Sequence, residues 1–123
     1  MKKIFFLPVV IVVLALGATS CTYYENDPVP VEVPDSVSFS ANVIPIFDAR
    51  CNSAGCHSTG GIQPDLTSTN AYNDLIIFGY VDTDFPELSV LYTKVHSGSM
   101  VQFAEPGDAE IILKWIEQGA EDN

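Results

Sequence analysis

From residue 40 to the end of the chain, apolar residues recur every three or four positions in four separate segments. This spacing places apolar side chains on one face of an α-helix. The segments cover residues 40–51, 70–79, 86–98 and 107–119. Only the short run at 76–81 hints at a strand. The pattern therefore predicts an all-α fold of about four short helices.

Residues that favour helix ends flank these segments. Asn42, Asn70 and Asp108 can cap helix N-termini, and Gly79 and Gly119 can end helices. The same spacing predicts which side chains are buried. The expected positions are Val43, Ile46 and Phe47; Ala71 to Phe78; Leu88, Leu91, Tyr92 and Val95; and Ile111, Ile112, Trp115 and Ile116.

The first 20 residues have the pattern of a secretory signal. Lys2 and Lys3 precede an uninterrupted apolar run at residues 4–16, and small residues then lead to Cys21. This run is shorter than the roughly 20 residues that span a bilayer, and it fits the core of a signal peptide. We therefore expect residues 1–20 to be a signal peptide and the protein to be exported; a retained membrane anchor is the alternative.

An acidic, proline-rich segment at residues 21–37 lacks apolar periodicity and is typical of an extended linker. The folded domain then covers residues 38–123. Without the signal, Arg50, Lys94 and Lys114 remain against 16 acidic residues, a formal charge of 3 − 16 = −13. Such a charge repels phosphate backbones, so we expect no nucleic-acid partner, and electrostatic steering would favour a basic one.

The candidate chemistry lies in the stretch CNSAGCH. Cys51 and Cys56 are separated by four residues, and His57 follows the second cysteine directly. In an exported protein such a pair can close a disulfide. Together with His57 and His96, the two cysteines could instead hold zinc. Two cysteines with a histidine directly after the second also resemble a site of covalent haem attachment, although that motif normally has two residues between the cysteines and this chain has four.

The stretch GATSC, which ends at Cys21, resembles a bacterial lipobox, with Ala18 where that pattern prefers leucine. The resemblance implies that Cys21 is lipidated and becomes the first residue of the mature protein. It also accounts for the cysteine count, because one anchor and one pair remain. We expect a cell-envelope lipoprotein that is anchored in a membrane and faces the periplasm or the outer-membrane surface.

Residues 39–120 resemble a small c-type cytochrome domain. The matching pieces occur in the family's order: VIPIF, GCH, GGIQPDL, PELSVLYTKV, GSM and ILKWIEQGA. The chain is similar to single-haem domains of Bacteroidetes lipoproteins and to planctomycete-type cytochrome c modules, in which the C-x4-C-H spacing also occurs. The resemblance implies a cytochrome c-like fold of about four short helices around one covalently bound haem c.

The resemblance assigns roles to the residues around the motif. Cys51 and Cys56 would bind the haem covalently, and His57 would be the proximal iron ligand. The carbonyl group of Pro64 would accept a hydrogen bond from the other ring nitrogen of His57 and so fix the orientation of the ring.

The distal ligand is expected to be Met100, because the family's methionine lies in the same loop. The family motif there is Met-Pro-Pro, whereas this chain has valine and glutamine after Met100, which predicts a less rigid loop. His96 is the alternative ligand and would give a haem of lower reduction potential.

Together these features predict a membrane-anchored monohaem cytochrome that carries single electrons between redox partners in the cell envelope. The sequence has no evident carboxylate pair, activated nucleophile or phosphate-binding loop, which favours a carrier over an enzyme. One alternative is a haem sensor or peroxidase-like domain, which would need an open sixth position on the iron. Another is a disulfide-closed structural or interaction module of an exported lipoprotein.

Overall fold

The computed structural model describes residues 30–123, so the predicted signal peptide, Cys21 and the first part of the linker lie outside the described residues. The described part is helical, as predicted, and contains four α-helices and no strand. Its elements are η1 (Phe39–Val43, a π-helical turn), α2 (Ile44–Arg50), α3 (Ala71–Ile77), η2 (Pro86–Leu88, a 3-10 turn), α4 (Val90–His96), η3 (Val101–Phe103, a 3-10 turn) and α5 (Asp108–Glu117). The run at 76–81 is the end of α3 and the turn after it.

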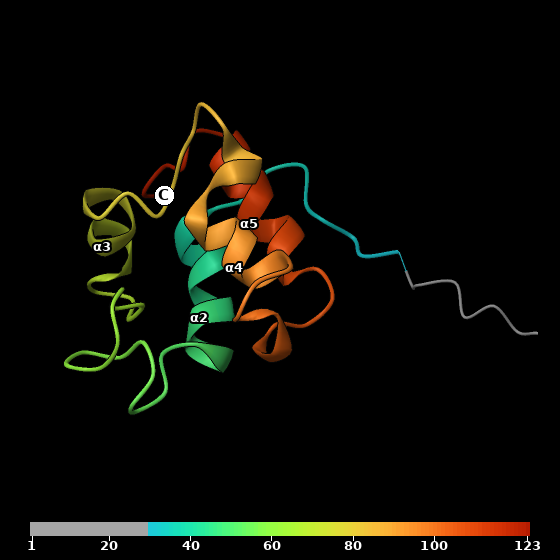
Figure 1. The fold of residues 1–123 in the computed structure, drawn as a ribbon. Helices are drawn as coiled ribbons and strands as arrows, with labels where there is room; N and C mark the ends of the chain where they lie inside the picture. Colours follow the sequence, from blue (N-terminus) through green and yellow to red (C-terminus); the bar gives the residue numbers. More distant parts are fainter. Residues whose placement is uncertain (1–29) are drawn as a thin grey trace, which may run out of the picture.

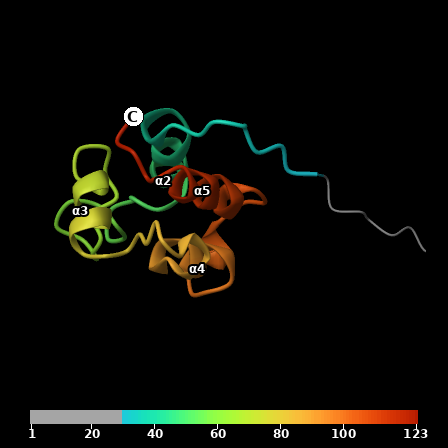
Figure 2. The ribbon, with the colours of Figure 1, turned by 90° about the horizontal axis from the view of Figure 1, so that it is seen from above.

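Three of the helices lie together and the fourth lies to one side. Helix α4 and the turn η1 both pack against α5, and η1 also packs against α2. Seen from above, α5 lies between α2 and α4, and α3 stands apart at the left (Figure 2). The long loops at 51–70 and 78–85 connect α3 to the rest (Figure 1).

Aromatic side chains join the first helical turn to the last helix. The ring centroids of Phe39 and Trp115 are 4.8 Å apart. Phe39 also meets Phe47 and Tyr72 edge-on, at 6.4 Å and 5.5 Å. Burying a large apolar side chain contributes about 1.5–3 kcal/mol, and such ring pairs add about 0.5–1.5 kcal/mol. This cluster therefore holds α2 and α5 together through η1.

The first helix begins earlier than predicted, and Asn42 is not its N-cap. Ser38 takes that role, because its Oγ accepts a hydrogen bond from the Ala41 amide at 3.3 Å. The Ser38 amide in turn donates to Oδ1 of Asn42 at 2.8 Å. Two amide groups at the helix start are thus satisfied by a reciprocal pair of side chains, as in a capping box.

The last helix agrees more closely with its prediction. Ile112, Trp115 and Ile116 are buried, and Ile111 is half-buried. The N-cap is Gly107 and not the predicted Asp108, whose carboxylate turns back to accept a hydrogen bond from the Glu105 amide at 2.8 Å.

Helix α4 is shorter than the predicted stripe. Leu88 belongs to η2 and is 71% exposed, because the extended backbone of Ser89 (ψ of 133°) separates η2 from α4. Leu91 and Val95 are buried as expected, and Tyr92 is half-buried.

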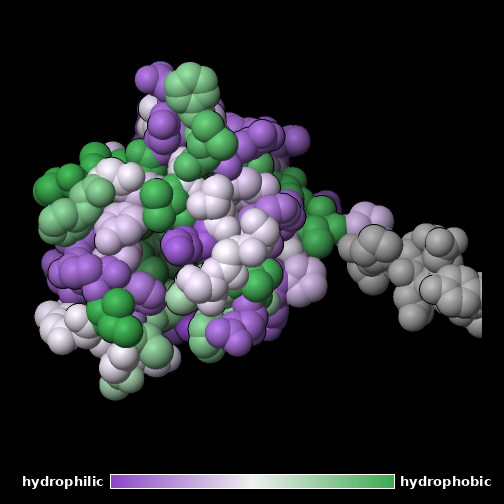
Figure 3. Space-filling model, in the orientation of Figure 1, coloured by the Kyte–Doolittle hydropathy of each residue, from purple (hydrophilic) through white to green (hydrophobic). Residues whose placement is uncertain are grey.

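Helix α3 has the predicted bounds and only part of the predicted buried stripe. Ala71 and Leu75 are buried, whereas Ile76, Ile77 and Phe78 are exposed. Figure 3 shows apolar residues gathered at this edge of the molecule, among polar ones. No helix within residues 30–123 has the length and apolar character needed to cross a membrane.

The end of the linker is tied to α5. The side chain of Gln118 accepts a hydrogen bond from the Val37 amide at 3.0 Å and donates one to the Asp35 carbonyl at 2.9 Å. Val37 is 1% exposed, and Val31 lies against Gly107 at the start of α5. Residues 30–37 therefore form a strap along the last helix.

Candidate functional site

A cavity of about 350 Å³ lies among the helices and the loops that connect them. Its apolar walls come from every α-helix, and they include Ile46, Phe47, Leu66, Leu75, Leu91 and Ile112. Small-molecule and cofactor sites typically have volumes of about 300–1,000 Å³ and mainly apolar linings. The cavity therefore has the size and character of a site for an apolar ligand.

The C-x4-C-H segment forms a hydrogen-bonded loop against this cavity. The Cys56 amide donates to the Ser53 carbonyl at 2.9 Å, and the His57 amide donates to the Cys51 carbonyl at 3.1 Å. The four residues between the cysteines thus turn outward as a loop. Cys51, Cys56 and His57 all line the cavity.

The ring of His57 is fixed by two backbone carbonyl groups. Its Nδ1 lies 3.1 Å from the carbonyl oxygen of Ile62 and 3.1 Å from that of Pro64. Because both neighbours are acceptors, Nδ1 carries the proton and Nε2 keeps its lone pair. A histidine held in this way is oriented to bind a metal ion through Nε2.

The chain between His57 and α3 needs a close approach of backbone atoms. A side chain at Gly61 would collide with the carbonyl oxygen of Cys56. Further on, the carboxylate of Asp65 accepts hydrogen bonds from the hydroxyl and amide of Thr67, at 2.6 Å and 3.0 Å, and from Asn70 at 2.9 Å. These bonds, the Thr67 hydroxyl first, hold the pKa of Asp65 well below its usual range. The loop that carries the Pro64 carbonyl is therefore built to keep its shape.

The two cysteines differ in their surroundings. Both are free thiols; Cys51 is half-buried and Cys56 is exposed. Burial raises the pKa of the Cys51 thiol to about 11, and the nearby Asp108 carboxylate adds to the rise. Cys51 is therefore protonated at neutral pH.

Met100 lines the cavity from the loop between α4 and η3. Its amide donates to the Lys94 carbonyl at 3.0 Å, and its carbonyl accepts from the Phe103 amide at 3.0 Å. A methyl group at Gly98 would lie only 2.9 Å from the Lys94 Cα, so glycine allows the tight turn. Backbone hydrogen bonds thus hold this loop, although it lacks the two prolines of the family pattern.

His96 does not line the cavity. It is exposed at the end of α4, and its ring stacks on Tyr92 with centroids 4.9 Å apart and planes 20° apart. Of the two candidate distal ligands, the fold brings only Met100 into the cavity with His57.

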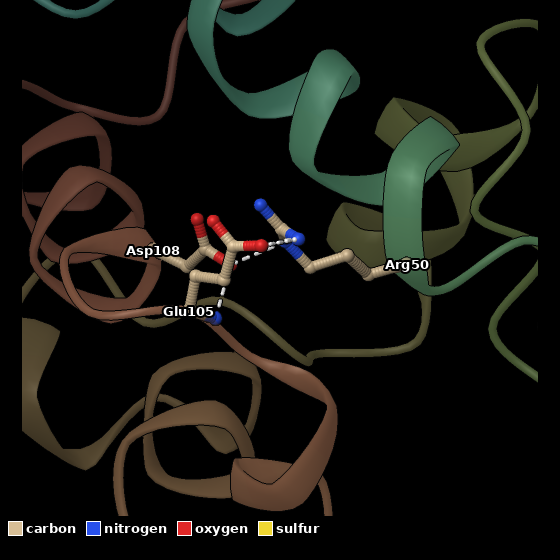
Figure 4. Close-up of polar contacts among 3 residues, drawn as sticks. All are labelled: Arg50, Glu105 and Asp108. Carbon is tan, nitrogen blue, oxygen red and sulfur yellow. Dashed lines mark hydrogen bonds and ion pairs between the residues drawn. The ribbon is translucent and has the colours of Figure 1, made fainter.

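Arg50, Glu105 and Asp108 form an ion cluster (Figure 4), and two of them, Arg50 and Asp108, line the cavity. The Arg50 Nε donates to Asp108 at 2.9 Å, and its guanidinium also contacts Glu105 at 2.6 Å. Sequence reasoning missed this cluster. The one available signal was that Arg50, among very few basic residues, directly precedes the first cysteine of the motif.

Within residues 30–123, no three His, Cys, Asp or Glu side chains are arranged as a metal-binding group. The cavity nevertheless brings together two thiols, an imidazole nitrogen and a thioether, from Cys51, Cys56, His57 and Met100. This set fits a flat apolar cofactor that is bound covalently at its edge and axially at a metal. No family model matches the chain, and the comparisons with curated proteins and with solved structures find no match either.

Proposed function

We propose that this chain is a monohaem c-type cytochrome that carries single electrons between redox partners in the cell envelope. One observation supports this proposal best. Met100 is far in sequence from Cys51, Cys56 and His57, yet all four residues line one apolar cavity. Bound haem would supply an iron that cycles between the ferrous and ferric states.

Covalent attachment would use the two thiols of the motif. Each S–H group, at Cys51 and at Cys56, would add across one vinyl double bond of the haem: the sulfur would bond to one carbon and the hydrogen would go to the other. The addition therefore needs no oxidant. The outward loop between the cysteines lets two sulfurs that are five positions apart reach the same cavity.

Axial binding would use His57 and Met100. The carbonyl groups of Ile62 and Pro64 hold the proton on Nδ1 of His57, which leaves Nε2 free to bind iron. A thioether ligand from Met100 raises the reduction potential relative to a second histidine. If His57 and Met100 both held the iron, no site would remain open on it for a substrate or a gas, which would favour a carrier over a sensor or peroxidase-like domain.

The cellular setting follows from the N-terminal pattern. Residues 1–20 would direct export, and lipidated Cys21 would anchor the domain to a membrane. The redox partner would be a protein with a basic docking surface, because the mature chain is strongly acidic.

The test is whether haem stays on the chain after denaturation. We would produce the protein together with a c-type haem maturation system and extract it with acidified organic solvent. One haem per chain should remain, and the Cys51→Ser, Cys56→Ser double variant should lose it. Cys21→Ser, which removes the third cysteine, is the matched control and should keep its haem.

A different result would replace this proposal. If no haem remains and both thiols resist labelling until a reductant is added, the pair forms a disulfide. The chain would then be a structural or interaction module.

A further inference from the structure

Basic side chains are unevenly distributed in this acidic chain. Residues 30–123 contain Arg50, Lys94 and Lys114 as their basic residues, in a sequence with 16 acidic residues. Two of the three, Arg50 and Lys94, line the apolar cavity, and Lys114 does not. Two of the three cations thus line the mainly apolar cavity, together with the Asp108 carboxylate that pairs with Arg50.

The two cavity cations differ in what they bind. Arg50 is already paired with Glu105 and Asp108. Lys94 makes no ion pair with any residue of the described range 30–123, and its side chain is exposed on α4. Lys94 is thus part of the cavity wall and has no carboxylate partner among residues 30–123, so its ammonium group is free to bind an anionic group of the ligand.

We propose that Lys94 binds a carboxylate of the ligand in this cavity, which for the proposed haem is one propionate. This inference rests on the proposed function. The cysteines would hold the vinyl edge of the ring, and they come from the loop after α2, whereas Lys94 comes from α4. A propionate beside apolar walls needs a partner, because an unpaired charge there loses hydration without compensation.

Pairing with Lys94 has a measurable electrostatic consequence. Ferric haem carries one more positive charge than ferrous haem, so a cation at the cavity favours the ferrous state and raises the reduction potential. The same cation lowers the pKa of the propionate. The other ionisable or charged side chains that line the cavity are Arg50, Cys51, Cys56, His57, Tyr80 and Asp108. In the haem-loaded protein the cysteines and His57 are bonded, and Arg50 and Asp108 are paired with each other.

The experiment measures the reduction potential of the haem-loaded protein against pH in three variants. Lys94→Gln should lower the potential, and it should move the pH-dependent step of the propionate upward by about one unit or more. Lys114→Gln removes the same charge away from the cavity and should change neither quantity appreciably. Lys94→Arg keeps the positive charge, so its reduction potential and pH-dependent step should match those of the unsubstituted protein. Resonance Raman bands of the propionate should shift in Lys94→Gln and stay unchanged in Lys114→Gln.

Two results would overturn the inference, and they are distinguishable. If all variants retain haem but Lys94→Gln and Lys114→Gln behave alike, Lys94 does not bind the propionate, and the proposed function stands. If no variant retains haem, the proposed function fails and the inference fails with it.

Discussion

At the scale of single residues, four positions separate His96 from Met100, and the turn at Gly98 decides which of them reaches the cavity. His96 ends α4 on the side where Tyr92 offers a stacking partner. The chain then reverses, and the bond from the Met100 amide to the Lys94 carbonyl directs the methionine inward. Sequence position alone left both residues as candidates, because the direction of a side chain after a turn depends on the path of the backbone.

The distal ligand gives the first prediction. In the haem-loaded protein, Met100→Ala should abolish the low-spin absorption spectrum, since iron would lose its sixth ligand. His96→Ala should leave the spectrum and the reduction potential unchanged, because the histidine packs outside the cavity. Loss of the low-spin spectrum in His96→Ala, with Met100→Ala unaffected, would show that the loop rearranges and that histidine binds the iron.

The burial of Cys51 gives the second prediction. In the haem-free protein with Cys56→Ser, the rate at which Cys51 is alkylated should rise with a midpoint near pH 11, compared with an ordinary value of 9.0. The thiolate is the reactive form, so a raised pKa delays the reaction. The native chain also keeps its proton where the unfolded chain has lost it, so the free energy of unfolding should fall between pH 9 and 11. A midpoint near 9 in native protein would contradict the burial of this thiol.

At the scale of helices, the sequence predicted the number and class of elements and was weaker at their ends. The apolar spacing located Ile112, Trp115 and Ile116 in α5 because one long amphipathic face leaves little ambiguity. It placed Leu88 on α4 wrongly, since the break at Ser89 depends on a buried hydroxyl that bonds to the Asp82 backbone. Spacing carries no information about such a contact between distant residues.

The apolar spacing also carries no information about the ion cluster of Arg50, Glu105 and Asp108, and the contribution of this cluster to stability can be tested. Asp108→Ala should lower the free energy of unfolding by about 1–3 kcal/mol, because it leaves the Arg50 Nε and the Glu105 amide without their acceptor. Glu105→Ala is the matched control. Its carboxylate is 64% exposed, so the loss should be at most about 1 kcal/mol. Equal losses for the two variants in urea titrations would contradict this difference.

At the scale of the whole molecule, the strong negative charge should govern encounters with charged redox partners. Residues 21–123 have a formal charge of 3 − 16 = −13, which follows directly from the sequence. The sequence did not predict where the few cations lie in the fold. Arg50 and Lys94 are far apart in the sequence, and both come to line the cavity only when the chain folds.

The direction in which salt changes the oxidation rate tests whether the overall charge controls these encounters. Oxidation of the ferrous protein by the cationic tris(phenanthroline)cobalt(III) ion should slow as ionic strength rises from about 10 mM to about 500 mM, because salt screens the attraction. Oxidation by anionic ferricyanide should accelerate over the same range. If the two oxidants respond in the same direction, the overall charge does not control the encounter.

The strap at residues 30–37 has a mechanical consequence for an anchored domain. A force applied at the N-terminal end of the domain would act first on the hydrogen bonds of Gln118 and on the buried side chain of Val37. It would act parallel to α5. The loops that carry His57 and Met100 lie outside this path. If Cys21 is the anchor, a pull on it would be taken up at the strap before it reaches the groups that would bind iron, and the electronic properties of the domain would stay constant.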